Sequence, residues 1–210
     1  MFITFEGIDG SGKSTQARRL AEYFRAEGRE VVLTREPGGS PGAEEIRRLL
    51  VEGEPERWSA ETEILLFTAA RRDHLERTVL PALERGAIVI SDRFADSTRV
   101  YQGVAQPELR VLVDNLHDLM IGREPDLTFI LDIDPAEGLA RGMHRLAGAA
   151  IDESRFEKRG LPFQESLREG FLGLAAEFPD RFRVIPAEGG PEEVFGRIVG
   201  VVEAESPCPA

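Results

Sequence analysis

Short apolar segments alternate along this chain with longer segments that mix apolar and charged residues. The apolar segments are rich in Val, Ile, Leu and Phe, the residues that favour buried strands. They fall at residues 2–6, 31–34, 87–91, 127–132 and 182–185.

The longer segments carry the mixed pattern that is typical of helices packed on a core. They fall at about 14–27, 42–51, 60–84, 107–121, 135–147, 162–178 and 191–203. Strands that alternate with helices predict an α/β fold, with a parallel sheet covered by helices on both faces. Pro81 is expected to bend or divide the long 60–84 helix, because proline has no amide hydrogen to donate.

The 210 residues fit one domain, which we expect at 1–204, followed by a flexible tail at 205–210. No internal repeat or low-complexity linker interrupts this domain. Residues at about 142–160 are rich in small and charged side chains. We interpret this segment as a mobile lid, and the alternative is an exposed connection with ordinary solvated charges.

The composition narrows the class of protein. Apolar residues make up 41% of the chain and charged residues 30%, as in soluble globular enzymes. A net charge of −12 argues against a general nucleic-acid or anionic-membrane surface. Without a signal-peptide pattern or an apolar run of membrane length, the expected compartment is the cytoplasm. Cys208 is the one cysteine and the three histidines lack metal-ligand spacing, so disulfide and Cys/His metal frameworks are not expected.

The most specific motif is Gly-Ile-Asp-Gly-Ser-Gly-Lys-Ser-Thr at residues 7–15, which matches G-x-x-x-x-G-K-[ST]. It lies between a predicted strand and a predicted helix, as a phosphate-binding loop requires. Its glycines let backbone N–H groups converge on an anion, and the helix N-terminus adds positive potential. Lys13 is expected to reach the β- and γ-phosphates of a nucleoside triphosphate, and the Ser14 hydroxyl suits Mg²⁺.

Charged side chains also follow the strands whose carboxyl ends should meet this loop. Asp9 lies inside the loop, where a carboxylate repels phosphate, so we expect a metal or a sugar hydroxyl as its partner; a solvent-facing side chain is the alternative. Arg93 could clamp a second phosphate, or else form a structural ion pair with Asp92. Asp92 could instead bind Mg²⁺ through water.

Two further groups of side chains suit a nucleobase. Phe67 and Arg71 lie four residues apart on a predicted helix and share a face, which combines a ring for stacking with a hydrogen-bonding guanidinium. A core-edge ring beside a solvated arginine is the alternative. If residues 95–103 form a helical turn, Thr98, Tyr101 and Gln102 fall on one side of it.

Taken together, these residues resemble the thymidylate kinases, a branch of the P-loop nucleoside-monophosphate kinases. The resemblance rests on Phe5–Gln16, Thr34–Ser40 with its Arg-Glu-Pro-Gly-Gly sequence, Leu66–Arg71, Asp92–Phe94 and Tyr101–Gly103, and it covers about residues 1–200. It implies the three-layer P-loop NTPase fold with a five-stranded parallel sheet and a mobile lid, a homodimer, and transfer of the ATP γ-phosphoryl group to dTMP with Mg²⁺. No nucleic acid or membrane is expected as a partner.

The resemblance also implies a role for each matched residue. Residues 7–15 and Arg141 would bind ATP, Arg141 against adenine. Ser14, Asp9 and Asp92 would serve the metal. Phe67 would stack on thymine and Arg71 would hydrogen-bond its carbonyl edge, with Thr98 and Gln102 close to the base. Tyr101 would pack near C2′ of the sugar. Arg93 would hold the acceptor phosphate, with Arg35 nearby. The implied dTMP-binding set is Asp9, Arg35, Pro37, Phe67, Arg71, Arg93, Thr98, Tyr101 and Gln102.

Some members of the family carry an extra catalytic arginine in the phosphate loop, where this chain has Gly10. The lid is therefore expected to supply it, from Arg145 or Arg155. The implied catalytic set is Asp9, Lys13, Arg93, Arg145 and Arg155. The lid run Leu146–Ile151 and the segment Ile185–Glu188 depart from the family pattern. Two alternatives stay open at this point: another P-loop nucleoside or nucleotide kinase, and an ATP-binding regulator without catalysis.

Overall fold

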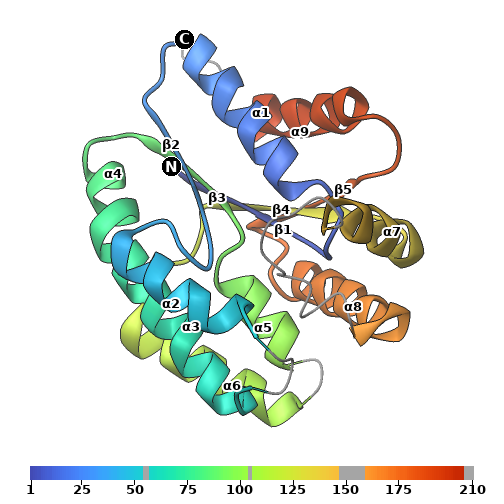
Figure 1. The fold of residues 1–210 in the computed structure, drawn as a ribbon. Helices are drawn as coiled ribbons and strands as arrows, with labels where there is room; N and C mark the ends of the chain where they lie inside the picture. Colours follow the sequence, from blue (N-terminus) through green and yellow to red (C-terminus); the bar gives the residue numbers. More distant parts are fainter. Residues whose placement is uncertain (54–56, 104–105, 147–158, 206–210) are drawn as a thin grey trace.

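A single parallel sheet organises the computed structural model, which describes residues 1–53, 57–103, 106–146 and 159–205 (Figure 1). Within these residues, five strands are hydrogen-bonded in the order β2-β3-β1-β4-β5, and each pair is parallel. The strands are β1 (Phe2–Glu6), β2 (Val31–Arg35), β3 (Ile88–Asp92), β4 (Leu127–Asp132) and β5 (Phe182–Pro186). The predicted strands are confirmed to within one residue at each end.

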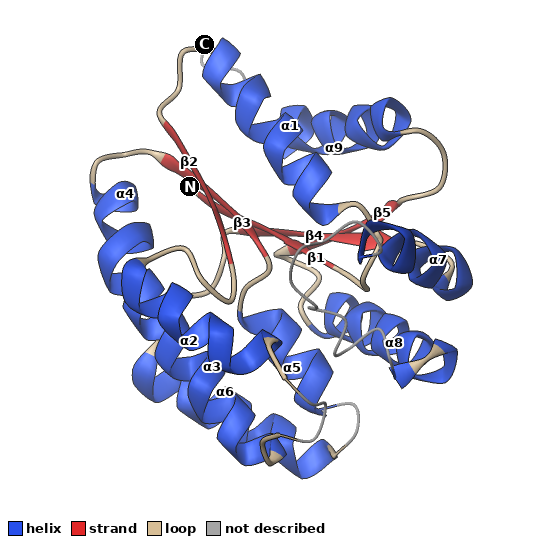
Figure 2. Ribbon diagram, viewed as in Figure 1, coloured by secondary structure: helices blue, strands red, loops and turns tan. Residues whose placement is uncertain are grey.

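Helices cover both faces of this sheet. Figure 2 shows α1 and α9 side by side on one face, with α4, α5 and α8 on the other. The helices are α1 (Lys13–Ala26), α2 (Pro41–Val51), α3 (Ala60–His74), α4 (Leu80–Glu84), α5 (Ala95–Gly103), α6 (Pro107–Met120), α7 (Pro135–Leu146), α8 (Leu161–Glu177) and α9 (Pro191–Glu205). The predicted three-layer α/β fold is therefore confirmed.

The central strand β1 is buried at all five positions, as a strand with neighbours on both sides and helices on both faces should be; its two polar residues, Thr4 and Glu6, are buried as well. Phe5 on β1 packs against Phe129 on β4, with ring centroids 5.3 Å apart. β2 and β5 lie at the edges and are only partly buried. Because β1 is held by both neighbours, the loop that follows it leaves from a rigid point.

The sequence predicted a bend or division in the 60–84 helix and left open a helical turn at 95–103, and the structure contains both. The predicted helix 60–84 is divided by a π-helical turn, η1 (Leu75–Val79), and Pro81 lies in the first turn of α4 just after it, where its missing amide hydrogen costs little. Residues 95–103, where the sequence left a helical turn open, form a full helix, α5, which is buried from Ala95 to Gln102. Tertiary packing, rather than a periodic sequence, stabilises α5.

Several predictions lie outside the described residues. They concern most of the lid, at 147–158, and nearly all of the tail, at 206–210. α9 continues to Glu205, one residue into the predicted tail. In the described part of the chain, no helix has both the length and the apolar character needed to cross a bilayer.

Candidate active site

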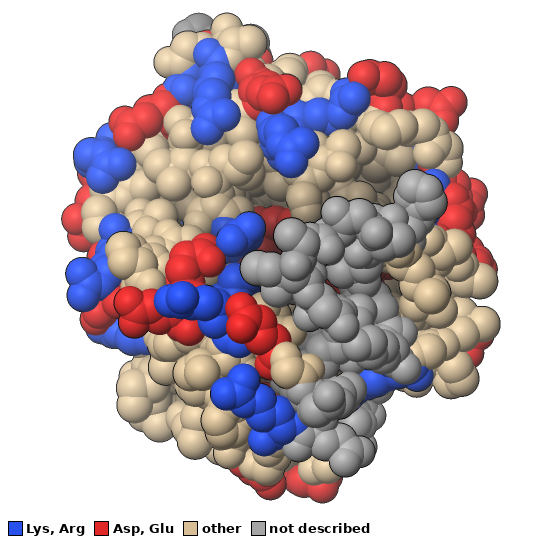
Figure 3. Space-filling model, in the orientation of Figure 1, with Lys and Arg blue, Asp and Glu red and all other residues tan. Residues whose placement is uncertain are grey.

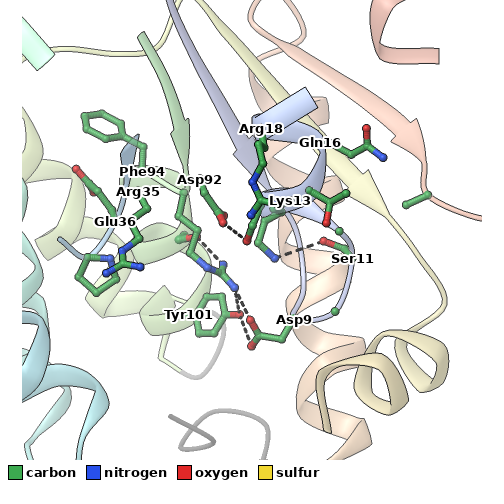
Figure 4. Close-up of a pocket in the computed structure, with 18 of the residues that line it drawn as sticks. Asp9, Ser11, Lys13, Gln16, Arg18, Arg35, Glu36, Asp92, Phe94 and Tyr101 are labelled. Carbon is green, nitrogen blue, oxygen red and sulfur yellow. Dashed lines mark hydrogen bonds and ion pairs between the residues drawn. The ribbon is translucent and has the colours of Figure 1, made fainter. Parts of the chain in front are cut away.

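A cavity of about 1020 Å³ opens at the carboxyl ends of β1, β2 and β3 (Figure 4). Parallel strands bring their carboxyl ends to one edge of the sheet, and ligands bind outside that edge. The loops after these three strands, together with α3, α5 and the segment before α9, all contribute to the lining.

The phosphate loop forms one end of the cavity, which residues 9–15 line. Gly12 immediately precedes α1 with φ 96°, a left-handed conformation that suits glycine. Gly7 and Ile8 lie behind the lining, Ile8 being 2% exposed. The predicted loop is therefore formed, with the N-terminus of α1 facing the cavity.

Lys13 is folded back into this loop. Its Nζ donates to the Ile8 carbonyl oxygen at 2.7 Å and lies 3.4 Å from Ser11 Oγ. Burial, and next the charge of Arg93, lower its pKa to about 8, against the opposing effect of nearby carboxylates. A phosphate bound in the loop would stabilise the charged ammonium.

Gly10 is closed to any side chain by its contact with α7. Its φ is 77°, and a Cβ there would lie 2.0 Å from the carbonyl oxygen of Gly138. Backbone of α7 cannot retreat as a flexible side chain could. Because α7 packs directly against Gly10, an arginine side chain would not fit at position 10 in this structure.

The middle of the cavity holds an interlocked group of Asp9, Arg93 and Tyr101. Arg93 Nη2 donates to Asp9 Oδ1 at 2.5 Å and to the Tyr101 hydroxyl at 3.2 Å. The Tyr101 hydroxyl donates to Asp9 Oδ2 at 3.0 Å. Burial raises the pKa of Tyr101 well above its usual value, and Asp9 raises it further, which keeps the hydroxyl protonated. The ion pair of Arg93 is thus with Asp9, and the alternative pairing with Asp92 is not observed.

Arg93 lies directly after β3 in a left-handed conformation, with φ 71°. Such a backbone is uncommon for a residue other than glycine and persists where its surroundings hold it. The Arg93 N–H donates to the Phe5 carbonyl oxygen, and the Ser91 hydroxyl donates to the Arg93 carbonyl oxygen. The residues that follow are held by Glu6, which is fully buried on β1. Its carboxylate accepts from the Phe94 N–H at 2.7 Å and from the Ser97 hydroxyl at 2.5 Å, and Ser97 Oγ accepts from Arg93 Nη1 at 2.9 Å.

Ser14 and Asp92 meet at the phosphate end of the cavity. The Ser14 hydroxyl donates to Asp92 Oδ2. Asp92 Oδ1 is buried without a hydrogen-bond partner among the described residues. Those residues contain no cluster of three His, Cys, Asp or Glu side chains that could enclose a metal. One hydroxyl and one carboxylate with a spare oxygen fit Mg²⁺, which binds through few protein ligands together with substrate phosphates.

The far end of the cavity is lined by Phe67, Arg71, Thr98 and Gln102. Arg71 is 4% exposed, and its Nη2 donates to Thr98 Oγ1 at 2.9 Å. Gln102 Oε1 is buried without a hydrogen-bond partner among the described residues. Phe67 and Arg71 face the same space as predicted, but Arg71 is buried and bonded rather than solvated.

The other predicted residues are more peripheral or lie outside the description. Arg35, Pro37 and Arg141 line the cavity, Arg35 paired with Glu44 and Arg141 with Glu137. The backbone of Arg145 belongs to the last turn of α7, whereas its side chain and all of Arg155 are outside the described residues.

The structure also brings residues to the site that sequence reasoning missed. They are Arg18, Glu36, Arg47, Ser97 and the residues Gly189, Pro191 and Val194, which follow the segment Ile185–Glu188 that the sequence had singled out. Arg18 follows Ser14 by four residues, so the helical repeat of α1 carried a usable signal for it. Figure 4 shows Arg18 beside Lys13. The others reach the cavity because the fold brings distant segments together, and no local sequence pattern predicts such contacts.

Basic side chains outnumber acidic ones in the cavity, although the chain as a whole carries a net charge of −12. The face in Figure 3 interleaves Lys and Arg with Asp and Glu. The excess of positive charge is thus local to the cavity, where it favours anionic ligands. The basic residues are Lys13, Arg18, Arg35, Arg47, Arg71, Arg93 and Arg141, and the acidic ones are Asp9, Glu36 and Asp92.

Comparison with known proteins agrees with this geometry. A family model described as thymidylate kinase matches residues 5–198. A thymidylate kinase from Dinoroseobacter shibae is 65% identical, over 94% of this chain and 93% of the relative, and one from Ruegeria pomeroyi is 62% identical, over 96% and 94%. The crystal structure of thymidylate kinase from Ehrlichia chaffeensis superposes with a TM-score of 0.76 and 38% identity, covering 97% of this chain and 98% of that one.

Proposed function

Because this chain belongs to the thymidylate kinase family and phosphorylates dTMP with ATP as the donor, we propose how its own residues divide that work. Relatives that are 60–65% identical all carry the name thymidylate kinase, which sets aside the regulator and the other nucleotide kinases left open by the sequence. The observation that carries the proposal is one cavity with a phosphate loop at one end and a buried Phe67–Arg71 face at the other.

The far end takes the thymine of dTMP. Phe67 lines the cavity and offers a ring face for stacking, and Arg71 offers donors to a carbonyl edge, which cytosine replaces with an amine. Thr98 and Gln102 complete this end, and Tyr101 fills the space beside the sugar. The acceptor phosphate lies against Arg93, with Arg35 and Pro37 at the rim.

The phosphate-loop end takes ATP. Backbone N–H groups of residues 9–15 and the Lys13 ammonium bind its phosphates, and Arg141 lies toward the adenine. We propose a direct in-line transfer, in which the dTMP phosphate oxygen attacks the γ-phosphorus and ADP leaves. An acceptor oxygen that is already ionised needs no strong general base, so positioning and charge neutralisation supply the catalysis.

We assign Mg²⁺ to Ser14 and Asp92, because Asp92 Oδ1 is the carboxylate oxygen there without a hydrogen-bond partner among the described residues. When bound, the ion would neutralise developing charge on the β- and γ-phosphates. Both oxygens of Asp9 face Arg93 and Tyr101, so we assign Asp9 mainly to orienting Arg93 near the sugar and phosphate of dTMP. Its role as a metal ligand stays a prediction.

A lid arginine, Arg145 or Arg155, would supply the charge that Gly10 does not. Alanine substitution of the responsible residue should lower kcat by about 10²-fold or more while the KM for dTMP changes little. The measurement is steady-state kinetics of both single variants and the double variant. If all three turn over like the parent, the catalytic role of the lid arginines is wrong.

We also propose a homodimer formed through α3 and α6, which pack on each other. These helices expose Leu65, Val111 and Leu119 at 56%, 61% and 78%, which are among the four largest exposed fractions of the large apolar residues that the structure describes. Sedimentation should report a dimer for the parent and a monomer for Val111→Glu/Leu119→Glu. A parent that sediments as a monomer at micromolar concentration would contradict this part.

The overall assignment is tested by coupled ADP release across dTMP, dUMP, dCMP, dGMP and dAMP. We expect dTMP to give the highest kcat/KM. A stronger reaction with another monophosphate would replace dTMP in the far end of the cavity. In parallel, Arg71→Ala should raise the KM for dTMP far more than the KM for ATP; equal effects on both would place Arg71 in general structure.

A further inference from the structure

A line of hydrogen-bonded side chains runs behind the nucleobase end of the cavity. Thr34 Oγ1 on β2 lies 2.7 Å from His74 Nε2, and His74 Nδ1 lies 2.9 Å from Glu36 Oε1. The second oxygen of Glu36 accepts from Arg71 Nε at 2.8 Å. His74 is 0% exposed, and the Glu36 and Arg71 side chains are each 4% exposed. The line joins an edge strand to the residue that faces the base.

The hydrogen-bond partners of Glu36 and His74 indicate which of their atoms carry a hydrogen. Burial raises the pKa of Glu36, but the charge of Arg71 and the hydrogen bond from His74 outweigh it, and the pKa lies below its usual value. The Glu36 carboxylate is therefore charged and only accepts. His74 Nδ1 must then carry the hydrogen that it donates to Glu36. In the neutral ring, Nε2 accepts from the Thr34 hydroxyl.

The surroundings of His74 leave its ring little freedom to turn. A Cβ on Gly39 would lie 2.5 Å from Nε2 and 2.4 Å from Thr34 Oγ1. Gly39 has φ +86°, so the loop after β2 can pass this close only with glycine here. The ring is thus held between the loop backbone, Thr34 and Glu36.

Arg71 receives its orientation from these contacts. Its Nε is bound by Glu36, and its Nη2 is bound by Thr98 Oγ1 and, at 3.3 Å, by the Phe94 carbonyl oxygen. No hydrogen bond to Nη1 is made by the described residues, and Arg71 lines the cavity. Nη1 is therefore the donor left for a ligand. Its direction depends on the plane in which Glu36 holds the guanidinium.

We propose that His74 is a positioning residue for base selectivity, acting on Arg71 through Glu36 and oriented in turn by Thr34. This rests on the proposed contact between Arg71 and thymine. If His74 no longer donates to Glu36, the carboxylate gains a free lone pair in a buried place and can turn toward the base end of the cavity. Nη1 then loses its fixed direction, and a base with an amine in place of the carbonyl is rejected less strongly.

The test compares two amides at position 74. His74→Asn places an amide N–H where Nδ1 lies and keeps the bond to Glu36, whereas His74→Gln reaches the place of Nε2 and keeps only the contact with Thr34. We measure kcat/KM for dTMP and dCMP and the KM for ATP. His74→Gln should lower the dTMP-to-dCMP ratio by about ten-fold or more, the effect of a lost hydrogen bond to a charged group. His74→Asn should keep the ratio within about three-fold.

A milder variant and two matched controls guard against a loss of folding. Thr34→Val should lower the ratio by about two- to five-fold. His117→Gln changes the other buried histidine of the described structure, and Thr4→Val changes a buried threonine that pairs with Thr128. Both controls should leave the ratio unchanged even where they lower the melting temperature.

Two outcomes separate this inference from its premise. If Arg71→Ala lowers the ratio but His74→Asn and His74→Gln give the same ratio, the positioning role of His74 is overturned and the function of Arg71 stands. If Arg71→Ala leaves the ratio unchanged, the assignment of Arg71 to the base fails, and the inference fails with it.

Discussion

The two ends of the cavity are built in different ways. The phosphate-loop end comes from one continuous stretch, residues 9–15, and it offers backbone N–H groups, a helix N-terminus and Lys13. The middle of the cavity and its far end, where we propose that the nucleobase binds, come from side chains far apart in sequence. Arg71 and Glu36 are separated by 35 positions, Arg93 and Asp9 by 84, and Tyr101 and Asp9 by 92.

The ends also differ in how their charges are satisfied before any ligand binds. Arg71 and Arg93 already hold Glu36 and Asp9 at 2.8 Å and 2.5 Å. If the acceptor phosphate binds Arg93 as we propose, it shares that arginine with Asp9, whereas a donor phosphate in the loop would meet backbone N–H groups. We infer that the phosphate-loop end binds phosphate mainly through its backbone N–H groups. The middle and the far end select their ligand through side chains that neighbouring side chains already hold in place before the ligand binds.

The largest effect should come from the loop. Lys13→Ala removes the ammonium that we propose binds the β- and γ-phosphates and should lower kcat by about 10³-fold at saturating ATP and dTMP. Circular dichroism should show an intact fold. Arg25→Ala, at an exposed arginine in the last turn of α1 and outside the cavity lining, is the matched control and should change kcat by less than about two-fold. A near-normal kcat for Lys13→Ala would contradict the proposed role of Lys13 and, with it, the difference between the phosphate-loop end and the rest of the cavity.

The next effect concerns the middle of the cavity. Arg93→Ala should lower kcat/KM for dTMP by about 10²- to 10³-fold and leave the KM for ATP within a few-fold, because we propose that Arg93 binds the acceptor phosphate. Arg35→Ala is the comparison, since its side chain is 55% exposed and should matter much less. Equal losses for both variants would show that a diffuse positive charge, rather than a fixed arginine, binds the acceptor.

Glu6 holds the backbone beside Arg93, and its ionisation gives a pH test. Burial, and next the charge of Asp96, raise the pKa of Glu6 to about 7, from 4.5 in the unfolded chain. The folded state therefore binds the proton more tightly than the unfolded state does. That stabilisation is complete below pH 4.5 and is lost as the pH rises through 7. The loss amounts to about 3 kcal/mol of unfolding free energy.

Glu6→Gln lacks this titration, so the difference in unfolding free energy between parent and variant should shift in favour of the variant from pH 5 to pH 8. Urea unfolding at four pH values measures it. Glu165→Gln, at an exposed position on α8, should show a constant difference. A constant difference for Glu6→Gln as well would mean that Glu6 stays ionised throughout, and that its ion pairs outweigh its burial.

The smallest effect concerns the sugar. Tyr101 is 8% exposed and is held by Asp9 and Arg93, so its ring should exclude a 2′-hydroxyl. Tyr101→Ala should reduce the preference for dTMP over ribothymidine monophosphate by about ten-fold or less in kcat/KM. Tyr101→Phe keeps the ring and should keep most of the preference. If both variants discriminate like the parent, another residue reads the sugar.

The sequence by itself determined the sheet and the phosphate loop. Apolar strand segments, the glycines of residues 7–12 and the Lys13-Ser14-Thr15 start of a helix act over a few neighbouring residues, so their conformations follow from local rules. The same local reasoning placed Phe67 and Arg71 on one helix face, because the helical repeat is fixed.

Only the tertiary structure decided which charged groups meet. The strand order β2-β3-β1-β4-β5 brings Arg93 to Asp9 rather than to its neighbour Asp92, and it places Glu36 between Arg71 and His74. No sequence pattern marked His74 or Glu6 for the site. The partner of a buried charge depends on the register and packing of strands and helices that are distant in the chain. The low dielectric of that packing, rather than any local preference, makes those pairs obligatory.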